Sequence, residues 1–242
     1  LLAAPSCKKG ENDPFLSLKS RKARLAGEYE MAVLDQTIQT TESNGDKILE
    51  VTGINGATGT VVTTHTPASG DQTIKTVNLA ISEATFSVKD DGTWSSLSII
   101  TRTWSEDGDE FFVDRTDYTS VTTTKESGNW SFLGGQPEEF ENKERVILNT
   151  LNSDVTEQVT TVTHYTFSDD PETNTGLPNT TTEVFGEGEI SVIYEIDMLK
   201  NKEMIFKRDL SGSTTNTSVF GGSSYSTTTT DIGNLEIKFE EK

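Results

Sequence analysis

Apolar and polar residues alternate along most of the chain after Tyr29, and this period of two limits the possible folds more than any other feature. The clearest run is Ile190–Met198, in which Ile, Val, Tyr, Ile and Met occupy every second position. Such alternation places apolar side chains on one face of a β-strand and polar side chains on the other. Turn-forming pairs such as Asn44-Gly45 and Asp107-Gly108 separate the runs. The pattern predicts an all-β fold of about ten to twelve strands, an antiparallel meander closed into a barrel with extra hairpins.

Charge and composition narrow the possible functions. The chain has 39 Asp and Glu residues against 20 Lys and Arg, a formal net charge of -19. Because nucleic-acid binding draws most of its affinity from Lys and Arg against phosphate, nucleic acid is not expected as a ligand. Threonine runs such as Thr122–Thr124 and Thr227–Thr230 suit solvent-facing strands, since threonine is β-branched. No stretch is apolar over the length of a bilayer-spanning helix.

The first seven residues are typical of a secretory signal and its processing site. Leu1–Ser6 is largely apolar and ends in small residues, and Cys7, the sole cysteine, follows directly. This arrangement resembles the bacterial lipobox, in which the signal is cleaved before a cysteine whose thiol is then acylated, for example with palmitate. A free cysteine in an N-terminal tail is the alternative. We expect residues 1–6 to be a signal-peptide remnant, Cys7 to be the lipidation site, and no internal disulfide to form.

Two short segments separate Cys7 from the predicted barrel. Residues 7–14 are polar and predict a lipidated tether, and residues 15–27 predict a basic capping segment with apolar residues at roughly helical spacing. Residues 8–24 hold six basic and two acidic residues, a net of +4, so the rest carries -19 - 4 = -23. A basic collar below an acidic body is expected to sit on lipid phosphates. Residues 28–242 are predicted to form one barrel domain.

Several short motifs, spread along most of the chain, are similar to motifs of one known protein family. The segment Asp13–Tyr29 leads into the first strand through Gly27-Glu28-Tyr29. Further motifs are Phe86–Trp94, Gly128–Phe132, Lys143–Leu148, Tyr194–Phe206 and Leu235–Phe239. Together they resemble the lipocalin-like outer-membrane lipoproteins of diderm bacteria, in which a short helix seals one barrel end and a Gly-x-Trp motif opens the first strand. Tyr29 takes the place of that tryptophan, and the resemblance implies a lipocalin-like barrel, a short N-terminal helix and an envelope location.

Residues that carry chemistry are sparse. His65 and His164 are the two histidines, each in a threonine-rich strand, and neither has the neighbours that a zinc site needs. No nucleophile elbow, phosphate loop or metalloprotease motif occurs. The acidic segments Glu106–Glu110 and Asp169–Asn174 offer clustered oxygens for Ca²⁺, but neither has EF-hand spacing, and solvated turns are the favoured explanation. We therefore expect no enzyme activity, no metal and no cofactor.

Four aromatic residues are candidates for ligand binding. Trp94, Trp104, Trp130 and Tyr118 lie in strand-like segments and would line a barrel cavity or stack on sugar rings. Packing in the core is the default expectation for aromatic residues on alternating strands, and ligand binding is the alternative.

These observations lead to one main functional prediction and two alternatives. The first is a non-catalytic, lipid-anchored outer-membrane lipoprotein on the cell exterior, held in the membrane through Cys7, which is an accessory subunit of an outer-membrane β-barrel protein or transporter complex. The second is a barrel that binds an apolar small molecule or glycan, and the third is a hydrolase that uses clustered carboxylates. A filled barrel interior would argue against the second.

Overall fold

A computed structural model of the chain describes residues 20–108, 112–135, 144–168, 170–200, 202–220 and 223–242, with the backbone alone for 216–220 and 223–227. Within these described residues, one short helix, α1 (Arg21–Leu25), precedes 13 strands of a single sheet. In chain order these are β1 (Gly27–Glu42), β2 (Lys47–Asn55), β3 (Thr58–Thr66), β4 (Thr73–Val88), β5 (Thr93–Asp107), β6 (Val113–Phe132), β7 (Arg145–Tyr165), β8 (Glu172–Thr175), β9 (Asn179–Val184), β10 (Ile190–Leu199), β11 (Glu203–Asp209), β12 (Gly212–Phe220) and β13 (Ser223–Glu241).

Local turn chemistry fixes where the hairpins reverse. Between β1 and β2, Gly45 has a φ of +95°, which residues with a Cβ rarely adopt, and the Asp46 amide donates to Asn44 Oδ1 at 2.9 Å. Between β4 and β5, the amide of Thr93 donates to Asp91 Oδ1 at 2.9 Å. Short polar side chains that accept from a backbone amide two residues later favour a turn over a continued strand.

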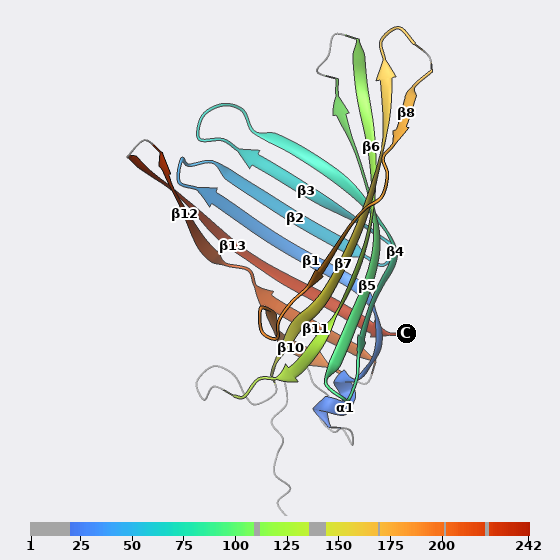
Figure 1. Cartoon of the computed structure of the whole chain (residues 1–242), viewed down its shortest axis with the longest axis vertical. Coiled ribbons are helices and arrows are strands. Elements are labelled where there is room, and N and C mark those ends of the chain that lie inside the picture. The colour runs from blue at the N-terminus through green and yellow to red at the C-terminus, as the bar shows by residue number, and fades with distance from the viewer. Residues whose placement is uncertain (1–19, 109–111, 136–143, 169, 201, 221–222) are drawn as a thin grey trace, which may run out of the picture.

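The first and last strands close the sheet into a barrel (Figure 1). β1 pairs with β13 from Tyr29 opposite Glu241 to Glu42 opposite Thr229. At the end of the barrel where α1 lies, which we call the lower end, β1 also pairs directly with β4. Above this end the β2–β3 hairpin is inserted between β1 and β4, which brings the described strands of the closed circuit from eight to ten. The predicted antiparallel meander, closed into a barrel with extra hairpins and a short N-terminal helix, is confirmed.

The barrel wall is continuous only in its lower half. There, β10 pairs with β7 and with β11, and β11 pairs with residues 234–240 of β13. In the upper half, β13 pairs with β12, while β7 pairs with β9 and β8. No pairing between described residues joins β12 to β8 or β9, so the upper half is open along one side (Figure 1).

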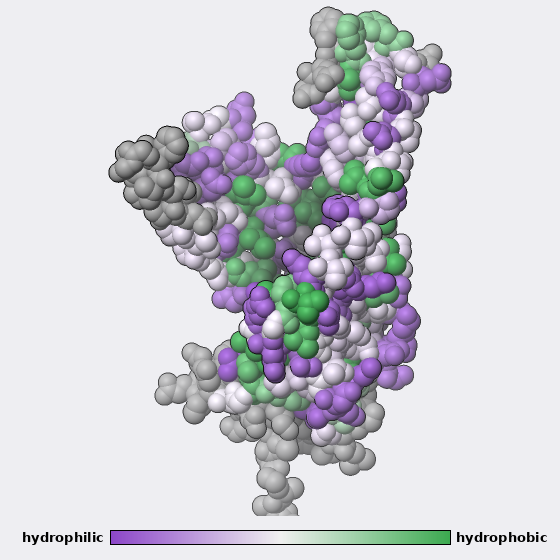
Figure 2. Space-filling model, in the orientation of Figure 1, coloured by the Kyte–Doolittle hydropathy of each residue, from purple (hydrophilic) through white to green (hydrophobic). Residues whose placement is uncertain are grey.

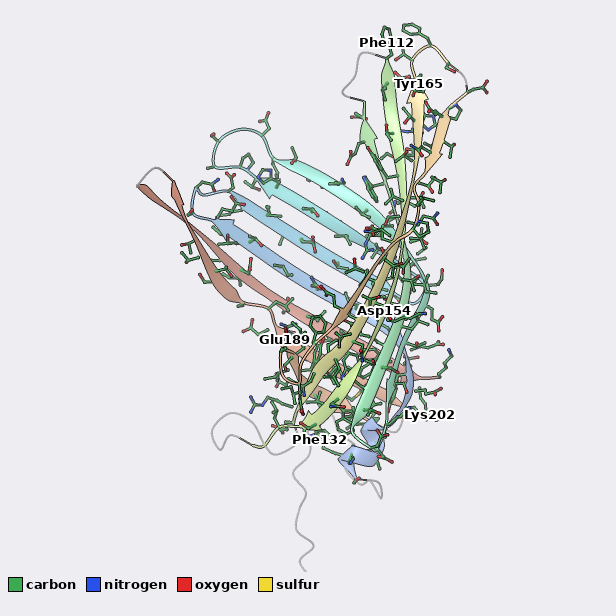
Figure 3. The ribbon with its side chains drawn as sticks, viewed as in Figure 1. Phe112, Phe132, Asp154, Tyr165, Glu189 and Lys202 are labelled. Carbon is green, nitrogen blue, oxygen red and sulfur yellow. The ribbon has the colours of Figure 1, made fainter. Side chains whose placement is uncertain are left out.

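The core fills the lower half. It consists of Leu25, Tyr29, Phe86, Val88, Trp94, Trp130, Val146, Leu148, Ile196, Leu199, Met204, Phe206 and Phe239, each at most 9% exposed. The aromatic rings pack edge-on or tilted, as between Phe86 and Phe206, whose centroids lie 6.2 Å apart. Figure 3 shows this crowding of side chains inside the lower barrel, with Phe132 near the lower end.

Helix α1 seals the lower end by a small set of contacts. Ser20 caps the helix, and the Tyr29 hydroxyl donates to the carbonyl oxygen of Arg24 at 2.7 Å. The Arg24 guanidinium donates to the carbonyl oxygen of Leu199 at the end of β10. A Cβ on Gly27 would lie 3.1 Å from the Tyr29 ring, so the Gly-x-Tyr motif lets this ring fold back over the strand entry.

Two predictions need correction. Short strands β8 and β9 raise the number of strands above the expected ten to twelve. The basic collar is also partly wrong, because Arg21 and Arg24 are only 9% and 4% exposed and do not face outward. The reason is helical geometry: positions i, i+3 and i+4 share one face, and in α1 these are Arg21, Arg24 and the core residue Leu25. Lys22 remains exposed.

Candidate functional site

The inner face of the upper half is the candidate site. By strand register it continues the face that carries the core, because Trp94, Ile100 and Trp104 all lie on one side of β5. We call this surface the open face. Its apolar and aromatic members include Leu34, Ile38, Ile54, Val61, Val77, Leu79, Ile100, Trp104 and Tyr118.

Exposure separates the open face from the core below it. At its base, Ile54 and Leu79 are 5% and 6% exposed. Further up, the remaining apolar residues are half-buried, since β10 and β11 do not extend across from them. Figure 2 shows hydrophobic surface at the bottom of the hollow between the two sides of the upper half. Partly uncovered apolar surface rimmed by polar groups is typical of a site that binds another molecule.

A stacked row of side chains crosses the open face near its upper rim. The rings of Trp104 and Tyr118 are parallel to within 3° with centroids 5.0 Å apart, and the Lys75 ammonium lies 5.2 Å from the Trp104 centroid. Lys75 also contacts Glu106 at 2.6 Å, and its hydrogen bond holds the pKa of Glu106 below the usual range. Because Lys75 and Tyr118 come from the strands on either side of β5, Trp104 is contacted from both sides.

Polar groups lie deeper on the same face. The Arg102 guanidinium donates to Thr122 Oγ1 at 3.0 Å, and the Ser120 hydroxyl donates to Glu157 Oε1 at 2.6 Å. Glu126 lies at the boundary with the filled core, and burial raises the pKa of its carboxyl group. The open face therefore combines apolar contact area with paired donors and acceptors, as interfaces do.

The four predicted ligand-binding aromatics divide into two pairs. Trp94 and Trp130 are each 6% exposed in the core, and their indole N–H groups donate to the carbonyl oxygens of Asn149 and Lys89. Trp104 and Tyr118 are half-buried on the open face. The structure thus brings only the second pair to a surface that a ligand reaches.

Other predicted positions lie elsewhere. Cys7 falls outside the residues that the structure describes, as do Asp109, Glu110 and Asp169 of the two acidic segments. His65 lies 4.0 Å from Asp46, and His164 contacts Asp117 on the outer face of β6 and β7. Among the described residues, no group of three or more His, Cys, Asp or Glu side chains is arranged to hold a metal ion.

One outer-face cluster contains the residue types of a hydrolase without their order. Asp117 accepts from the Ser105 hydroxyl at 2.6 Å and contacts His164 Nε2 at 2.9 Å. The Ser105 hydrogen bond is the main reason that the pKa of Asp117 is lowered. A catalytic triad places the histidine between the serine and the acid, so that the imidazole accepts the serine proton. Here the aspartate is central, and the cluster joins β5, β6 and β7 instead.

Two hollows lie along the barrel wall, away from Trp104 and Tyr118. One of about 520 Å³ lies along β1, β2 and β3 beside Asp35 and Thr60, and one of about 320 Å³ lies beside Lys207 and Glu236. By strand register Asp35, Thr60, Lys207 and Glu236 point away from the core. The part of the chain that the structure describes contains no helix with the length and apolarity to span a bilayer.

Sequence reasoning missed Lys75, Arg102, Glu106 and Glu157. Alternation places each of them on the inner face of its strand, so the signal that could have found them is their charge at an inner position. A charge facing inward where a core is expected is such a signal, because an unpaired buried charge is costly.

Comparison with known proteins gives no match to a protein family, to a curated protein or to a solved structure. The resemblance to lipocalin-like lipoproteins therefore stays a prediction.

Proposed function

We propose that this protein is a non-catalytic docking lipoprotein, anchored in the outer membrane through Cys7, whose open face binds a segment of a larger outer-membrane protein. The partner is a β-barrel protein or transporter complex, and the chain is its accessory subunit on the cell exterior. The family resemblance implies the envelope location, and the lipobox-like start of the chain supports the anchor.

The observation that carries the proposal is the change from a filled to an open interior along one continuous face. The described core residues pack together in the lower half, which argues against an apolar small molecule held deep in the barrel. Above it, the same face remains half-buried. A protein segment fits this surface better than a small molecule does, because small-molecule sites enclose most of their ligand.

The orientation agrees with such a role. The helix that follows the tether seals the lower end, and the open half lies at the opposite end of the molecule (Figure 1). An anchor on Cys7 would hold the lower end near the lipid and direct the open face away from it.

Affinity purification in mild detergent tests the proposal. Val77→Asp and Ile38→Asp place a carboxylate on the open face, and Thr76→Asp and Thr37→Asp place one on the outer face of the same strands. The wild type and both outer-face variants should recover one outer-membrane β-barrel protein, and the two open-face variants should recover at least tenfold less of it. Repeated recovery of the chain alone, or equal recovery from all variants, would contradict the proposal.

A glycan is the second candidate ligand for the same face. Half-buried Trp104 and Tyr118 beside Arg102 and Glu106 supply the aromatic and hydrogen-bonding groups that sugars use. Titration calorimetry with soluble envelope polysaccharides separates the two candidates. Saturable heat that Tyr118→Ala abolishes would favour the glycan, and no heat would leave the protein segment.

A further inference from the structure

The end of the long arm formed by the upper parts of β5, β6 and β7 carries a pair of exposed aromatic residues. Phe112 is 56% exposed and Phe167 is 79% exposed, and their ring centroids lie 5.8 Å apart. Figure 3 shows Phe112 at the extreme upper end of the arm, close to Tyr165. Two large apolar side chains in contact at the exposed end of an arm are unusual in an acidic protein. Contiguous apolar surface of this kind is normally buried away from water.

Hydrogen bonds between the two turns hold this pair in place. The amide of Thr166 donates to the carbonyl oxygen of Phe112 at 3.1 Å, and the Thr166 hydroxyl donates to Asp114 Oδ1 at 2.7 Å. The Tyr165 hydroxyl donates to Glu172 Oε2 at 2.8 Å. A binding surface that is already ordered loses less conformational entropy on association than a flexible one.

Carboxylates surround the aromatic pair. Asp107, Asp114, Asp170 and Glu172 are all exposed on the strands and turns at this end of the arm. Among the described residues nearby, Arg115 is the nearest cation in sequence, and it pairs with Asp117 at 2.9 Å. An anionic lipid surface would repel such a tip, and so would a second copy of a chain whose net charge is -19.

We propose that Phe112 and Phe167 form a docking knob that inserts into an apolar socket rimmed by Lys or Arg on a partner protein. Apolar insertion supplies the affinity, and the surrounding carboxylates select a cationic rim and steer the approach. The knob lies at the end of the arm and shares no residue with the open face, so this inference does not depend on the function proposed above.

An amino-substituted β-cyclodextrin provides a defined probe, because it is an apolar cavity with ammonium groups on its rim. Neutral β-cyclodextrin is the control for charge. The expected result is saturable binding of the cationic form, at least tenfold tighter than the neutral form at low salt, with NMR shifts at Phe112 and Phe167. Phe112→Ser/Phe167→Ser should reduce this affinity at least tenfold, and Ile74→Ser/Ile232→Ser should change it less than twofold. Ile74 and Ile232 are matched controls, since they are 67% and 62% exposed on β4 and β13.

Three results would overturn the proposal. The first is equal binding of both cyclodextrins, or binding that survives loss of both phenylalanines. The second is flotation with zwitterionic phosphatidylcholine vesicles that is lost in the Phe→Ser variant, which would assign the knob to a lipid surface. The third is a dimer in sedimentation velocity that the same variant dissociates, which would assign it to a second copy of the chain.

Discussion

Tyr29→Phe is the most informative test of how the lower end is sealed. The Tyr29 side chain is 2% exposed, and its hydroxyl donates to the Arg24 carbonyl oxygen at 2.7 Å, so it joins β1 to α1. Phenylalanine keeps the ring in contact with Gly27 and removes only the hydrogen bond. A typical intramolecular hydrogen bond contributes about 0.5–1.5 kcal/mol, and a buried acceptor left without it adds a desolvation cost of about 1 kcal/mol. We expect the free energy of unfolding at pH 7 to fall by about 1.5–2.5 kcal/mol, or roughly 3–10 °C in Tm for a chain of this length.

The pH dependence of this difference gives a second readout. Burial, together with the Glu241 carboxylate, raises the pKa of Tyr29 from 10.0 to about 12. The folded state therefore holds the phenolic proton more tightly than the unfolded state does. This stabilisation is fully present below pH 10 and is lost as the pH rises through about 12. The wild type should lose stability faster than Tyr29→Phe across this window, so the two should converge.

Urea unfolding at pH 7, 9, 10.5 and 11.5, followed by tryptophan fluorescence, measures both effects. Tyr118→Phe is the control, since it removes a different hydroxyl and leaves Tyr29 in place. A Tyr29→Phe variant that is as stable as the wild type at pH 7, with a parallel alkaline decline, would refute the reasoning.

Three further predictions concern the core, the boundary of the open face and the anchor. Trp130→Ala should lower the free energy of unfolding by about 3–5 kcal/mol in urea denaturation, because it empties a site that is 6% exposed; a change below 1 kcal/mol would mean that the core is not packed. Glu126→Gln should raise Tm at pH 7, because the raised pKa of Glu126 means that its ionised form opposes folding. The gain in Tm should vanish below about pH 4, where the carboxyl group is protonated in both the folded and the unfolded state. An equal gain in Tm at both pH values would point to another cause. Cys7→Ser should move the chain from the membrane pellet to the soluble fraction without changing its Tm, and a variant that stays in the pellet in the wild-type amount would exclude lipid anchoring.

The sequence predicts which residues share a face, but not what covers that face. Trp94 and Trp104 lie on the same side of β5, and alternation gives them the same environment. Trp94 is 6% exposed and Trp104 is half-buried, because β10 and β11 stand opposite only the first. That difference depends on pairings between distant residues, such as Glu195 of β10 with Arg145 of β7 and Tyr29 of β1 with Glu241 of β13, which local periodicity does not contain.

The basic capping segment shows the same limit. Its position and short helix were predictable from the spacing of apolar residues and the glycine at its end. The inward direction of Arg24 was not, since its guanidinium donates to the Leu199 carbonyl at the far end of β10. The basic capping segment therefore presents less positive charge to the proposed membrane surface than its composition implies.

Cysteine labelling of intact membranes tests the central claim most directly. Acylation would block the only natural cysteine, so a maleimide reports on one introduced thiol at a time. We compare Val77→Cys on the open face with Thr76→Cys, its neighbour on the outer face. In the purified protein both should label rapidly, because neither is covered. In membranes Thr76→Cys should still label rapidly, and Val77→Cys should label at least tenfold more slowly until mild detergent releases the partner. Equal labelling of the two positions in membranes would contradict docking at the open face.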